Sequence, residues 1–455
     1  MKKFLPVILL FLICSWNADA QKFVQVTKVN SAQSITIGQD EVLEVKLPST
    51  PSTGYSWALA NDETIIEQAG DWSFVSDSPE NPIGASGIQI IRYTAKSKGK
   101  ANLEFVYKRQ WESDILDYYR ISITTEGAYT GVPIISVTEP LNPELTNPGA
   151  STRALPAKFS WLDEGKCTPV KNQGSCGSCW SFAACGSFES VIKIFDNVTK
   201  DLSEQWLVNC DKQSSGCSGG WCPDYMFKSY GAVYEVDQKY TQQNGTCKST
   251  YTYHEKIKGY TQVALNPTVA QIKQAIYDFG PVWVAVCVGT NFNAYKSGAV
   301  LTKSDGTQVN HAVVLVGWDD AQNCWVLRNS WGTSWGEKGG YMRIAYGVSS
   351  IGYKTTYIDY KGVIPHVVTN VDNISNTSIN NVYPNPTPGI FNISGVEKDN
   401  NVEVYDVYGK LVYKSAAPQN SIVSVDLSQQ SKGMYFYKII DSSLKNVKQG
   451  KVMVY

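Results

Sequence analysis

The stretch from Gln173 to Phe182 constrains the fold of this chain more than any other, because it places a cysteine at the start of a predicted helix. Apolar residues follow Cys179 at the spacing of one buried helical stripe, at Ala184, Phe188, Val191 and Phe195. The N-terminal end of a helix carries a partial positive charge and free N–H groups, which favour the thiolate form of cysteine. The pattern predicts that Cys179 is a reactive nucleophile. The alternative is that the cysteines of this stretch only form disulfides.

A thiolate needs a base, and the whole chain contains three histidines. His254 lies in a polar, aromatic run, which is typical of a surface histidine, and His366 follows Ile-Pro in a predicted linker. His311 instead begins an apolar run, 311–318, that predicts a buried strand and a rigidly held imidazole. Asn329 follows further along the chain, where an amide can orient that imidazole. We therefore expect His311 to be the base and Asn329 to orient it.

These residues resemble the papain-like cysteine peptidases, in which a Cys-Gly-Ser-Cys-Trp signature is followed by histidine and asparagine roughly 130–150 residues downstream. The resemblance covers residues 154–360. It rests on further motifs in the same order, at 168–173, 202–211, 216–220 and 329–336. It implies an α+β peptidase fold with two lobes, a helical lobe and a β-barrel lobe.

The resemblance also implies a mechanism. Cys179 and His311 would form a thiolate–imidazolium pair, which attacks a peptide carbonyl and forms a thioester acyl-enzyme that water hydrolyses. The side-chain amide of Gln173 and the backbone N–H of Cys179 would hold the oxyanion. Asn329 would fix the imidazole tautomer, and Trp331 would shield that hydrogen bond from solvent. Neither a metal nor a cofactor is implied.

A substrate groove is also implied by the resemblance. Glycines without side chains would let an extended peptide backbone approach closely, although they also fit ordinary turns. Trp221 and Cys222 would line the pocket for the second residue before the scissile bond, which favours a hydrophobic or aromatic side chain in the substrate. The predicted substrate-binding residues are Gly177, Gly219, Gly220, Trp221, Cys222, Asn310 and Trp331.

The cysteines mark the central segment, since all of them except Cys14 lie between Cys167 and Cys324. In an exported protein such a group implies disulfides. The resemblance pairs Cys176 with Cys217, and Cys210 with Cys247. The cysteines left without an assigned partner are Cys167, Cys185, Cys222, Cys287 and Cys324. Of these, Cys185 is expected to be a small buried hydrophobe.

Residues 1–20 predict export, because two lysines precede an apolar run at 4–13 and small residues precede an expected cleavage after Ala20. No later stretch is long and apolar enough for a transmembrane helix. The 40 Lys and Arg residues balance the 41 Asp and Glu residues, so the overall charge does not favour nucleic acid or an anionic membrane as a partner.

Residues 21–126 alternate between apolar and polar side chains, as in Leu43 to Leu47, which predicts a small all-β immunoglobulin-like sandwich. Three of its loops, 50–57, 84–87 and 109–111, resemble those by which chagasin-type inhibitors block papain-like peptidases. That family usually has Asn at the position of Thr50 and Pro at that of Gln110. The predicted inhibitor-loop residues are Thr50, Pro51, Thr53, Gly54, Tyr55, Arg109 and Trp111. The alternative is a spacer domain.

The linker 127–153 connects this domain to the peptidase segment, and its flexible span is about 30 Å by coil scaling. An inhibitor tethered in this way has an effective concentration of roughly millimolar. No helical, charged prosegment precedes the peptidase segment, so the β domain is the candidate for holding the peptidase latent. Arg153 is a candidate processing site.

After a second linker, 361–381, residues 382–455 show short β runs separated by turns, which predict another small sandwich. This segment resembles the C-terminal sorting domain of type IX secretion. The resemblance implies export through the periplasm of a Gram-negative bacterium by outer-membrane machinery that reads the domain. The alternative is a carbohydrate-binding or adhesive sandwich.

Together these features predict a multidomain protein, an α+β two-lobed peptidase at 154–360 flanked by two all-β sandwiches. The predicted function is a secreted or cell-surface cysteine endopeptidase, with polypeptides as substrates and its own N-terminal domain as an inhibitor. The alternative is an exported inhibitor or binding protein whose peptidase fold is only a scaffold.

Overall fold

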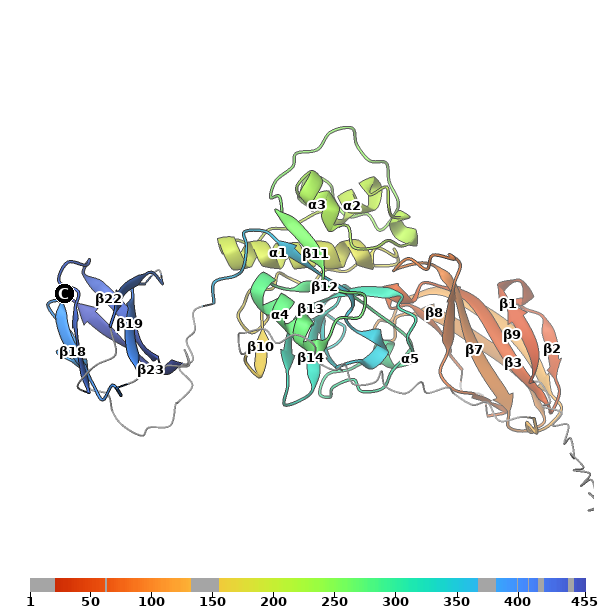
Figure 1. The fold of residues 1–455 in the computed structure, drawn as a ribbon. Coiled ribbons are helices and arrows are strands. Elements are labelled where there is room, and N and C mark those ends of the chain that lie inside the picture. The colour runs from red at the N-terminus through yellow and green to blue at the C-terminus, as the bar shows by residue number, and fades with distance from the viewer. Residues whose placement is uncertain are drawn as a thin grey trace, which may run out of the picture. The chain divides into compact units, whose positions relative to one another are not determined.

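The structure is a computed structural model that describes residues 21–61, 64–131, 155–366, 382–398, 400–407, 409–415, 421–440 and 446–455. The chain divides into two compact units, 1–365 and 366–455 (Figure 1). The predicted signal peptide, Cys14, Arg153 and most of both predicted linkers lie outside the described residues. The first unit contains both the N-terminal sandwich and the peptidase segment, and the domain boundaries stay predictions.

The N-terminal sandwich consists of two sheets around one core. One sheet has the order β1-β3-β7-β5, with β6 also paired to β7, and the other has the order β2-β9-β8-β4. The strands of the first sheet are β1 (Lys22–Thr27), β3 (Glu41–Ser49), β5 (Ile66–Gln68), β6 (Ser73–Ser76) and β7 (Gly87–Ala95). Those of the second are β2 (Ser34–Ile37), β4 (Ser56–Leu59), β8 (Gly99–Lys108) and β9 (Ile115–Thr125). Leu43, Val45 and Leu47 all enter the core, which confirms the predicted alternation.

The helical lobe is built on α1 (Cys179–Asp196), with α2 (Glu204–Cys210) and α3 (Asp224–Ser229) beside it. In Figure 1, α1 runs between these two helices and the strands of the second lobe. The predicted stripe is buried at Ala184, Phe188 and Val191, and other faces of α1 are buried as well because both lobes pack on it. Cys179 is thereby fixed at the junction of the lobes.

The second lobe is a seven-stranded sheet with the order β11-β16-β12-β13-β14-β15, in which β10 also pairs with β13. Helix α4 (Val269–Phe279), which Thr268 caps, and helix α5 (Thr290–Asn293) belong to this lobe. The strands are β10 (Lys158–Ser160), β11 (Gly259–Gln262), β12 (Val282–Val286), β13 (His311–Asp319), β14 (Cys324–Arg328), β15 (Tyr341–Ala345) and β16 (Tyr353–Asp359). Strand β13 is buried throughout and begins at His311, as its apolar run predicts.

Two disulfides stabilise the helical lobe, Cys176–Cys217 and Cys210–Cys247. The first ties the segment before α1 to the short 3-10 helix Gly216–Ser218. The predicted groove residues Gly219 and Gly220 follow this helix directly. The cysteines without a disulfide in the described part of the chain are Cys167, Cys179, Cys185, Cys222, Cys287 and Cys324. Cys185 is fully buried on α1, where it packs as a small apolar side chain.

The second unit is a smaller sandwich with sheet orders β17-β18-β21 and β20-β19-β22-β23. Its strands are β17 (Val382–Tyr383), β18 (Ile390–Ser394), β19 (Asn401–Tyr405), β20 (Leu411–Lys414), β21 (Ile422–Asp426), β22 (Gly433–Ile440) and β23 (Asn446–Val454). Val402, Val404 and Val425 lie in its core.

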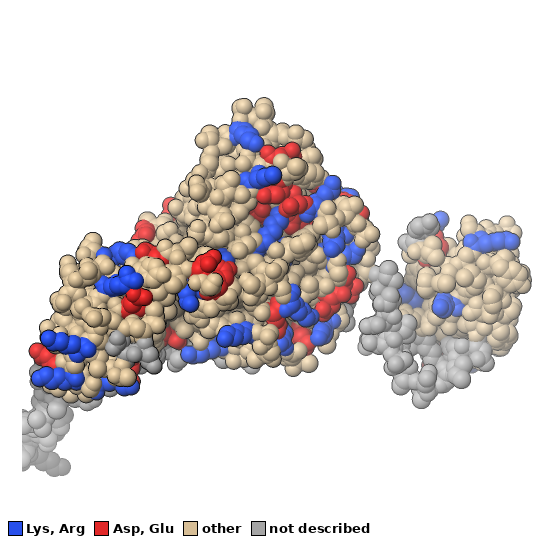
Figure 2. Space-filling model, turned by 180° about the vertical axis from the view of Figure 1, so that it is seen from behind, with Lys and Arg blue, Asp and Glu red and all other residues tan. Residues whose placement is uncertain are grey.

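Charged side chains of both signs are interspersed over the face seen in Figure 2, which agrees with the balanced composition. Among the described residues, no helix is long and apolar enough to cross a membrane.

Candidate active site

Helix α1 and strand β13 bring the candidate nucleophile and base together. Cys179 is the first residue of α1, and its Sγ accepts a hydrogen bond from the backbone N–H of Ala312, with 3.4 Å between N and Sγ. Ala312 follows His311 on β13. The sulfur is fully buried, and this burial raises the pKa of the thiol to about 12, although the Ala312 N–H and the Ser52 side chain act in the opposite direction.

His311 is also fully buried, and its Nε2 lies 2.8 Å from Oδ1 of Asn329. An amide oxygen can only accept a hydrogen bond, so Nε2 carries the proton and Nδ1 presents its lone pair. Nδ1 has no hydrogen-bond partner among the residues that the structure describes. Burial lowers the pKa of His311 to about 4, while the bond to Asn329 acts in the opposite direction. Burial therefore disfavours the charged form of both the imidazole and the thiol in this docked arrangement.

The Trp331 indole stacks on the His311 ring, with 5.1 Å between ring centroids. It is fully buried. Its Nε1 donates to the backbone carbonyl of Ser52, a residue of the N-terminal sandwich, at 2.8 Å. The indole therefore contacts both the candidate base and the N-terminal sandwich.

Gln173 lies on the segment before α1 and is held on three sides. Its Oε1 accepts from the hydroxyl of Ser330 at 2.7 Å, and its Nε2 donates to the carbonyl of Cys176 at 2.9 Å. Its backbone N–H donates to the carbonyl of Ser330 at 2.9 Å. An amide NH₂ has two donors, so one N–H of Gln173 remains for a developing oxyanion.

The predicted groove is occupied by residues 81–85 of the N-terminal sandwich. The N–H of Gly220 donates to the carbonyl of Ile83 at 2.9 Å, and the two residues form an antiparallel bridge. The N–H of Gly84 donates to the carbonyl of Asn310 at 3.0 Å. Gly177 and Gly219 lie against the backbone of Gly84. The predicted glycines are therefore the places where another backbone approaches closely.

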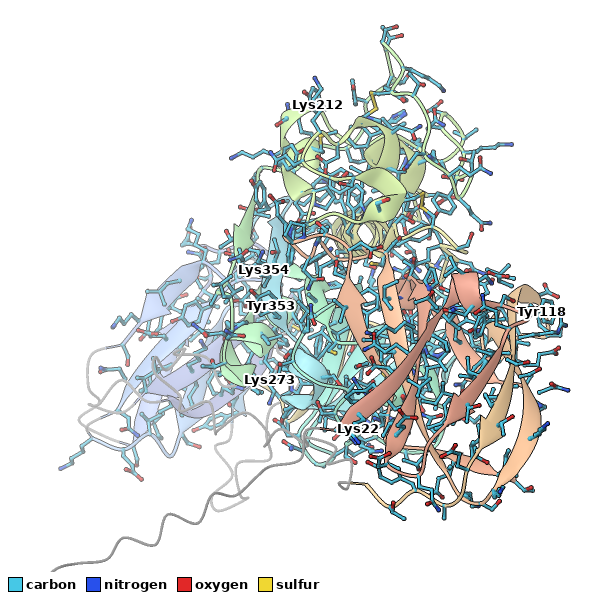
Figure 3. All side chains as sticks on the ribbon, turned by 90° about the vertical axis from the view of Figure 1, so that its right-hand side faces the viewer. Lys22, Tyr118, Lys212, Lys273, Tyr353 and Lys354 are labelled. Atoms are coloured by element: carbon cyan, nitrogen blue, oxygen red, sulfur yellow. A yellow bond between two sulfur atoms is a disulfide. The ribbon has the colours of Figure 1, made fainter. Side chains whose placement is uncertain are left out.

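The side chain of Ile83 is fully buried in the core cluster that contains Cys179 and Trp180. Trp221 and Cys222 pack against the same cluster. The outer face of Trp221 is covered by Lys354, whose Nζ lies 3.3 Å from the ring centroid; Figure 3 labels this lysine.

Two further loops of the sandwich contact the peptidase segment. The buried Arg109 donates from Nη1 to Oδ1 of Asn172 at 3.0 Å and from Nη2 to the carbonyl of Gly174 at 3.3 Å, on either side of Gln173. Trp111 stacks on Trp331, with 5.3 Å between centroids. Gly54 lies against both indoles, where a Cβ would come within 2.6 Å of Trp111 and 3.0 Å of Trp331.

The remaining predicted loop residues act within their own domain. The N–H of Thr50 donates to the hydroxyl of Tyr107 at 2.9 Å, and Pro51 opens the short helical turn Pro51–Thr53. The carbonyl of Thr53 accepts from Nε of Arg109 at 2.8 Å, and the Tyr55 ring lies 4.8 Å from the Arg109 guanidinium. These contacts within the sandwich hold the loop 50–57 in its conformation.

Several contacts were not foreseen from the sequence. They involve Ser52, Ile83 and Ala312, together with Asn81, whose Nδ2 donates to the carbonyl of Val309 at 3.1 Å. An apolar residue in the turn-rich run 81–87 is the one signal that could have pointed to Ile83. The others act through backbone groups or a small hydroxyl, for which the sequence carries no pattern.

Comparisons with known proteins give a family match for each of the three predicted domains. Three family profiles match: the papain family cysteine proteases at residues 155–360, the chagasin family peptidase inhibitors I42 at 36–124, and the secretion system C-terminal sorting domain at 381–454. The last match supports export from the cell by a secretion system.

Individual relatives match less than half of this chain. The senescence-specific cysteine protease SAG39 of Oryza sativa is 37% identical over 204 residues, which cover 43% of this chain and 59% of that protein. Cysteine proteinase 1 of Entamoeba histolytica is 36% identical over 222 residues, 46% of this chain and 69% of that protein. The solved structure of the bromelain protease from Ananas comosus in complex with the E64 inhibitor is 34% identical, has a TM-score of 0.42, and is matched over 46% of this chain and 100% of that one.

This chain spans about three fifths of the length of the first of these relatives. The profile match, the identity over most of the Entamoeba protein and the arrangement of Cys179, His311 and Asn329 lead to one assignment. The chain belongs to the papain family of cysteine proteases.

Proposed function

We propose that this protein is an exported cysteine endopeptidase that its own N-terminal domain keeps latent. The observation that carries the proposal is the orientation of His311. Its Nε2 is bound by Asn329, which leaves the lone pair of Nδ1 for proton transfer, and the next residue, Ala312, donates its N–H to the Cys179 sulfur at the start of α1. A base with a free lone pair next to a thiol at a helix N-terminus is suited to nucleophilic attack on a carbonyl.

The mechanism follows from these positions once the groove is open. Nδ1 of His311 takes the Cys179 proton, and Sγ attacks the peptide carbonyl carbon to form a tetrahedral oxyanion. The free N–H of Gln173 and the backbone N–H of Cys179 hold that oxyanion. The imidazolium then protonates the leaving amine, which gives a thioester, and water attacks the thioester with His311 again as the base.

Latency is supported by the burial of the site. Loops of the N-terminal domain cover Cys179, His311 and Trp331, whose side chains are all fully buried. The contacts include backbone hydrogen bonds, the Trp111–Trp331 stack and the Arg109 guanidinium. A substrate cannot reach the thiol until this domain leaves.

Ile83 and Gly84 support a proposal about substrate preference. Their backbone bonds to Gly220 and Asn310 are those that an extended peptide would make with the groove, with Ile83 two residues before the scissile position and Gly84 one residue before it. The pocket beside Trp221 and Cys222 therefore accepts a branched aliphatic side chain.

We expect peptides with Ile, Val or Leu at the second position before the scissile bond to show kcat/KM values at least about tenfold above those with Asp or Lys there, because a buried charge without a partner costs far more than a misfit methyl group. A peptide library varied only at that position measures this. A preference for a charged residue would contradict the proposed pocket.

The export route is part of the proposal. The sequence signals at 1–20 and 382–455, together with the sorting-domain match, support passage through the periplasm of a Gram-negative bacterium and recognition by outer-membrane type IX machinery. The product would be secreted or held at the cell surface.

The peptidase proposal is tested in the full chain with a specific protease site inserted between residues 131 and 155. After cleavage and dilution in a reducing buffer, an unstructured polypeptide should be cut at internal bonds. The Cys179→Ala chain should show no hydrolysis, while the matched control Cys185→Ala, which changes another buried cysteine of α1, should retain it. Hydrolysis that persists in Cys179→Ala would refute the proposed nucleophile.

A further inference from the structure

The Tyr240 hydroxyl bonds to two residues, Gln173 and Ser178, of the segment that leads into α1. It donates to the backbone carbonyl of Gln173 at 2.8 Å and lies 2.6 Å from the hydroxyl of Ser178. A phenol has one proton, and the Gln173 carbonyl can only accept. The Ser178 hydroxyl therefore donates to Tyr240 at 2.6 Å, since its other acceptor, the Cys176 carbonyl, lies farther away at 3.5 Å. This gives a directed chain from Ser178 through Tyr240 to Gln173.

Both partners of Tyr240 are adjacent to a proposed oxyanion donor. Gln173 itself provides the side-chain amide. The peptide bond that joins Ser178 to Cys179 provides the backbone N–H. The distance between the two donors therefore depends on the conformation of the chain between Gln173 and Cys179, and Tyr240 bonds near both ends of this segment.

Tyr240 is itself firmly placed. Its backbone N–H donates to Oε1 of Glu235 at 2.8 Å. Its ring meets the Phe182 ring edge-on, with 4.8 Å between centroids and an interplanar angle of 85°. Burial raises the pKa of the hydroxyl above its ordinary value, so the group stays protonated across the working range of pH. Phe182 belongs to α1, so the ring is fixed to the same helix that begins at Cys179.

We propose that Tyr240 is a positioning residue that sets the spacing of the two oxyanion donors. The proposal rests on the proposed peptidase function. Two hydrogen bonds in series strengthen each other, and misplacing one donor by a fraction of an ångström weakens its bond to the developing oxyanion. Tyr240 touches neither the substrate nor the reacting atoms.

The test is Tyr240→Phe in the chain that has been cut between 131 and 155 and diluted. We expect kcat to fall about tenfold with KM nearly unchanged, because only the transition state carries the oxyanion. Binding of a peptide aldehyde, whose adduct with the thiol places its oxygen in the same hole, should weaken by a similar factor. The rate of alkylation by iodoacetamide should not change, because alkylation forms no oxyanion.

Two further variants keep the test decisive. Ser178→Ala interrupts the same chain at its other end and should shift kcat and aldehyde binding in the same direction. Tyr234→Phe removes a hydroxyl that bonds Glu255 in the same lobe and should change neither. An unchanged kcat in Tyr240→Phe, or an equal loss of alkylation and hydrolysis, would overturn the proposal. If the wild-type chain reacts with iodoacetamide but hydrolyses nothing, the peptidase function fails, and the positioning role fails with it.

Discussion

Replacing Gly84 with valine in the uncut, full-length chain is expected to raise peptide hydrolysis on the order of a thousandfold, because the substitution forces the N-terminal domain off the groove. A Cβ at this position would lie 2.2 Å from the carbonyl oxygen of Gly177 and 2.9 Å from its carbonyl carbon. Both are backbone atoms, so no side chain can move aside. Gly84 also has a φ of 92°, in a region that side chains with a Cβ avoid.

The size of the expected increase in hydrolysis follows from the overlap between the valine side chain and the backbone of Gly177. A backbone overlap of this depth costs about 4 kcal/mol or more, and each 1.36 kcal/mol shifts an equilibrium tenfold. The tether holds the domain at roughly millimolar effective concentration, so the domain redocks readily unless the contact itself is destroyed. The observable is the initial rate of peptide hydrolysis by the uncut chain.

Gly70→Val is the matched control for this variant. Gly70 is exposed in the same domain and has a φ of 81°, so valine imposes similar backbone strain without the overlap with Gly177. Its neighbour Asp71 pairs with Lys303, but an exposed ion pair of this kind contributes little. Activation by Gly70→Val as strong as that by Gly84→Val would show that strain in the sandwich, and not the groove contact, releases the enzyme. A Gly84→Val chain as inactive as the wild type would refute the docked arrangement.

The sequence identified the elements whose residues follow a regular period. The apolar run that begins at His311 predicted a buried strand, and β13 begins at that residue. The stripe after Cys179 predicted the helix α1. The choice of His311 was possible because His254 and His366 lie in segments of a different character. In each case a local pattern and the burial that it implies point to the same element.

The loop contacts could not be predicted in the same detail, because they depend on two surfaces meeting. Nothing in the order of residues indicates that the carbonyl of Ser52 faces Trp331, or that Ile83 enters the core of the peptidase segment. The pKa of the Cys179 thiol could not be predicted for the same reason. The helix N-terminus alone favours a thiolate, but burial raises the pKa of the thiol and favours its protonated form.

The burial of Cys179 predicts a second large effect, on the rate at which this thiol is alkylated. Iodoacetamide should alkylate Cys179 at least about a thousandfold more slowly in the uncut chain than in the cut and diluted chain at neutral pH, since the sulfur is fully buried and a thiol with a pKa near 12 is almost entirely protonated there. Mass spectrometry of the peptide that contains Cys179, sampled over time, gives both rates. Cys167, which is partly exposed and is not one of the predicted groove residues, serves as an internal reference thiol.

The Gly84→Val variant links the alkylation rate of Cys179 to catalysis. A buried sulfur is alkylated only when the domain has left, and a substrate also enters only then, so both rates are proportional to the open fraction of the chain. Gly84→Val should therefore raise the alkylation of Cys179 and the hydrolysis of peptide by the same factor. If alkylation rises while hydrolysis does not, the domain covers the thiol without controlling catalysis.

Alkylation of Cys179 in the uncut chain is expected to become faster as the pH rises. The docked state keeps the Cys179 proton up to a pH of about 12, whereas the open Cys179–His311 pair loses its last proton at a lower pH. Between these two values the docked state binds one more proton, so raising the pH favours opening by up to about tenfold per unit. Alkylation of the uncut chain should therefore climb between roughly pH 9 and 10, while that of the cut chain stays nearly flat because its thiol is already ionised beside the imidazole. A fall in the uncut chain over this range would show that the docked thiol is not the protonated form, and that burial by the N-terminal domain does not set its state.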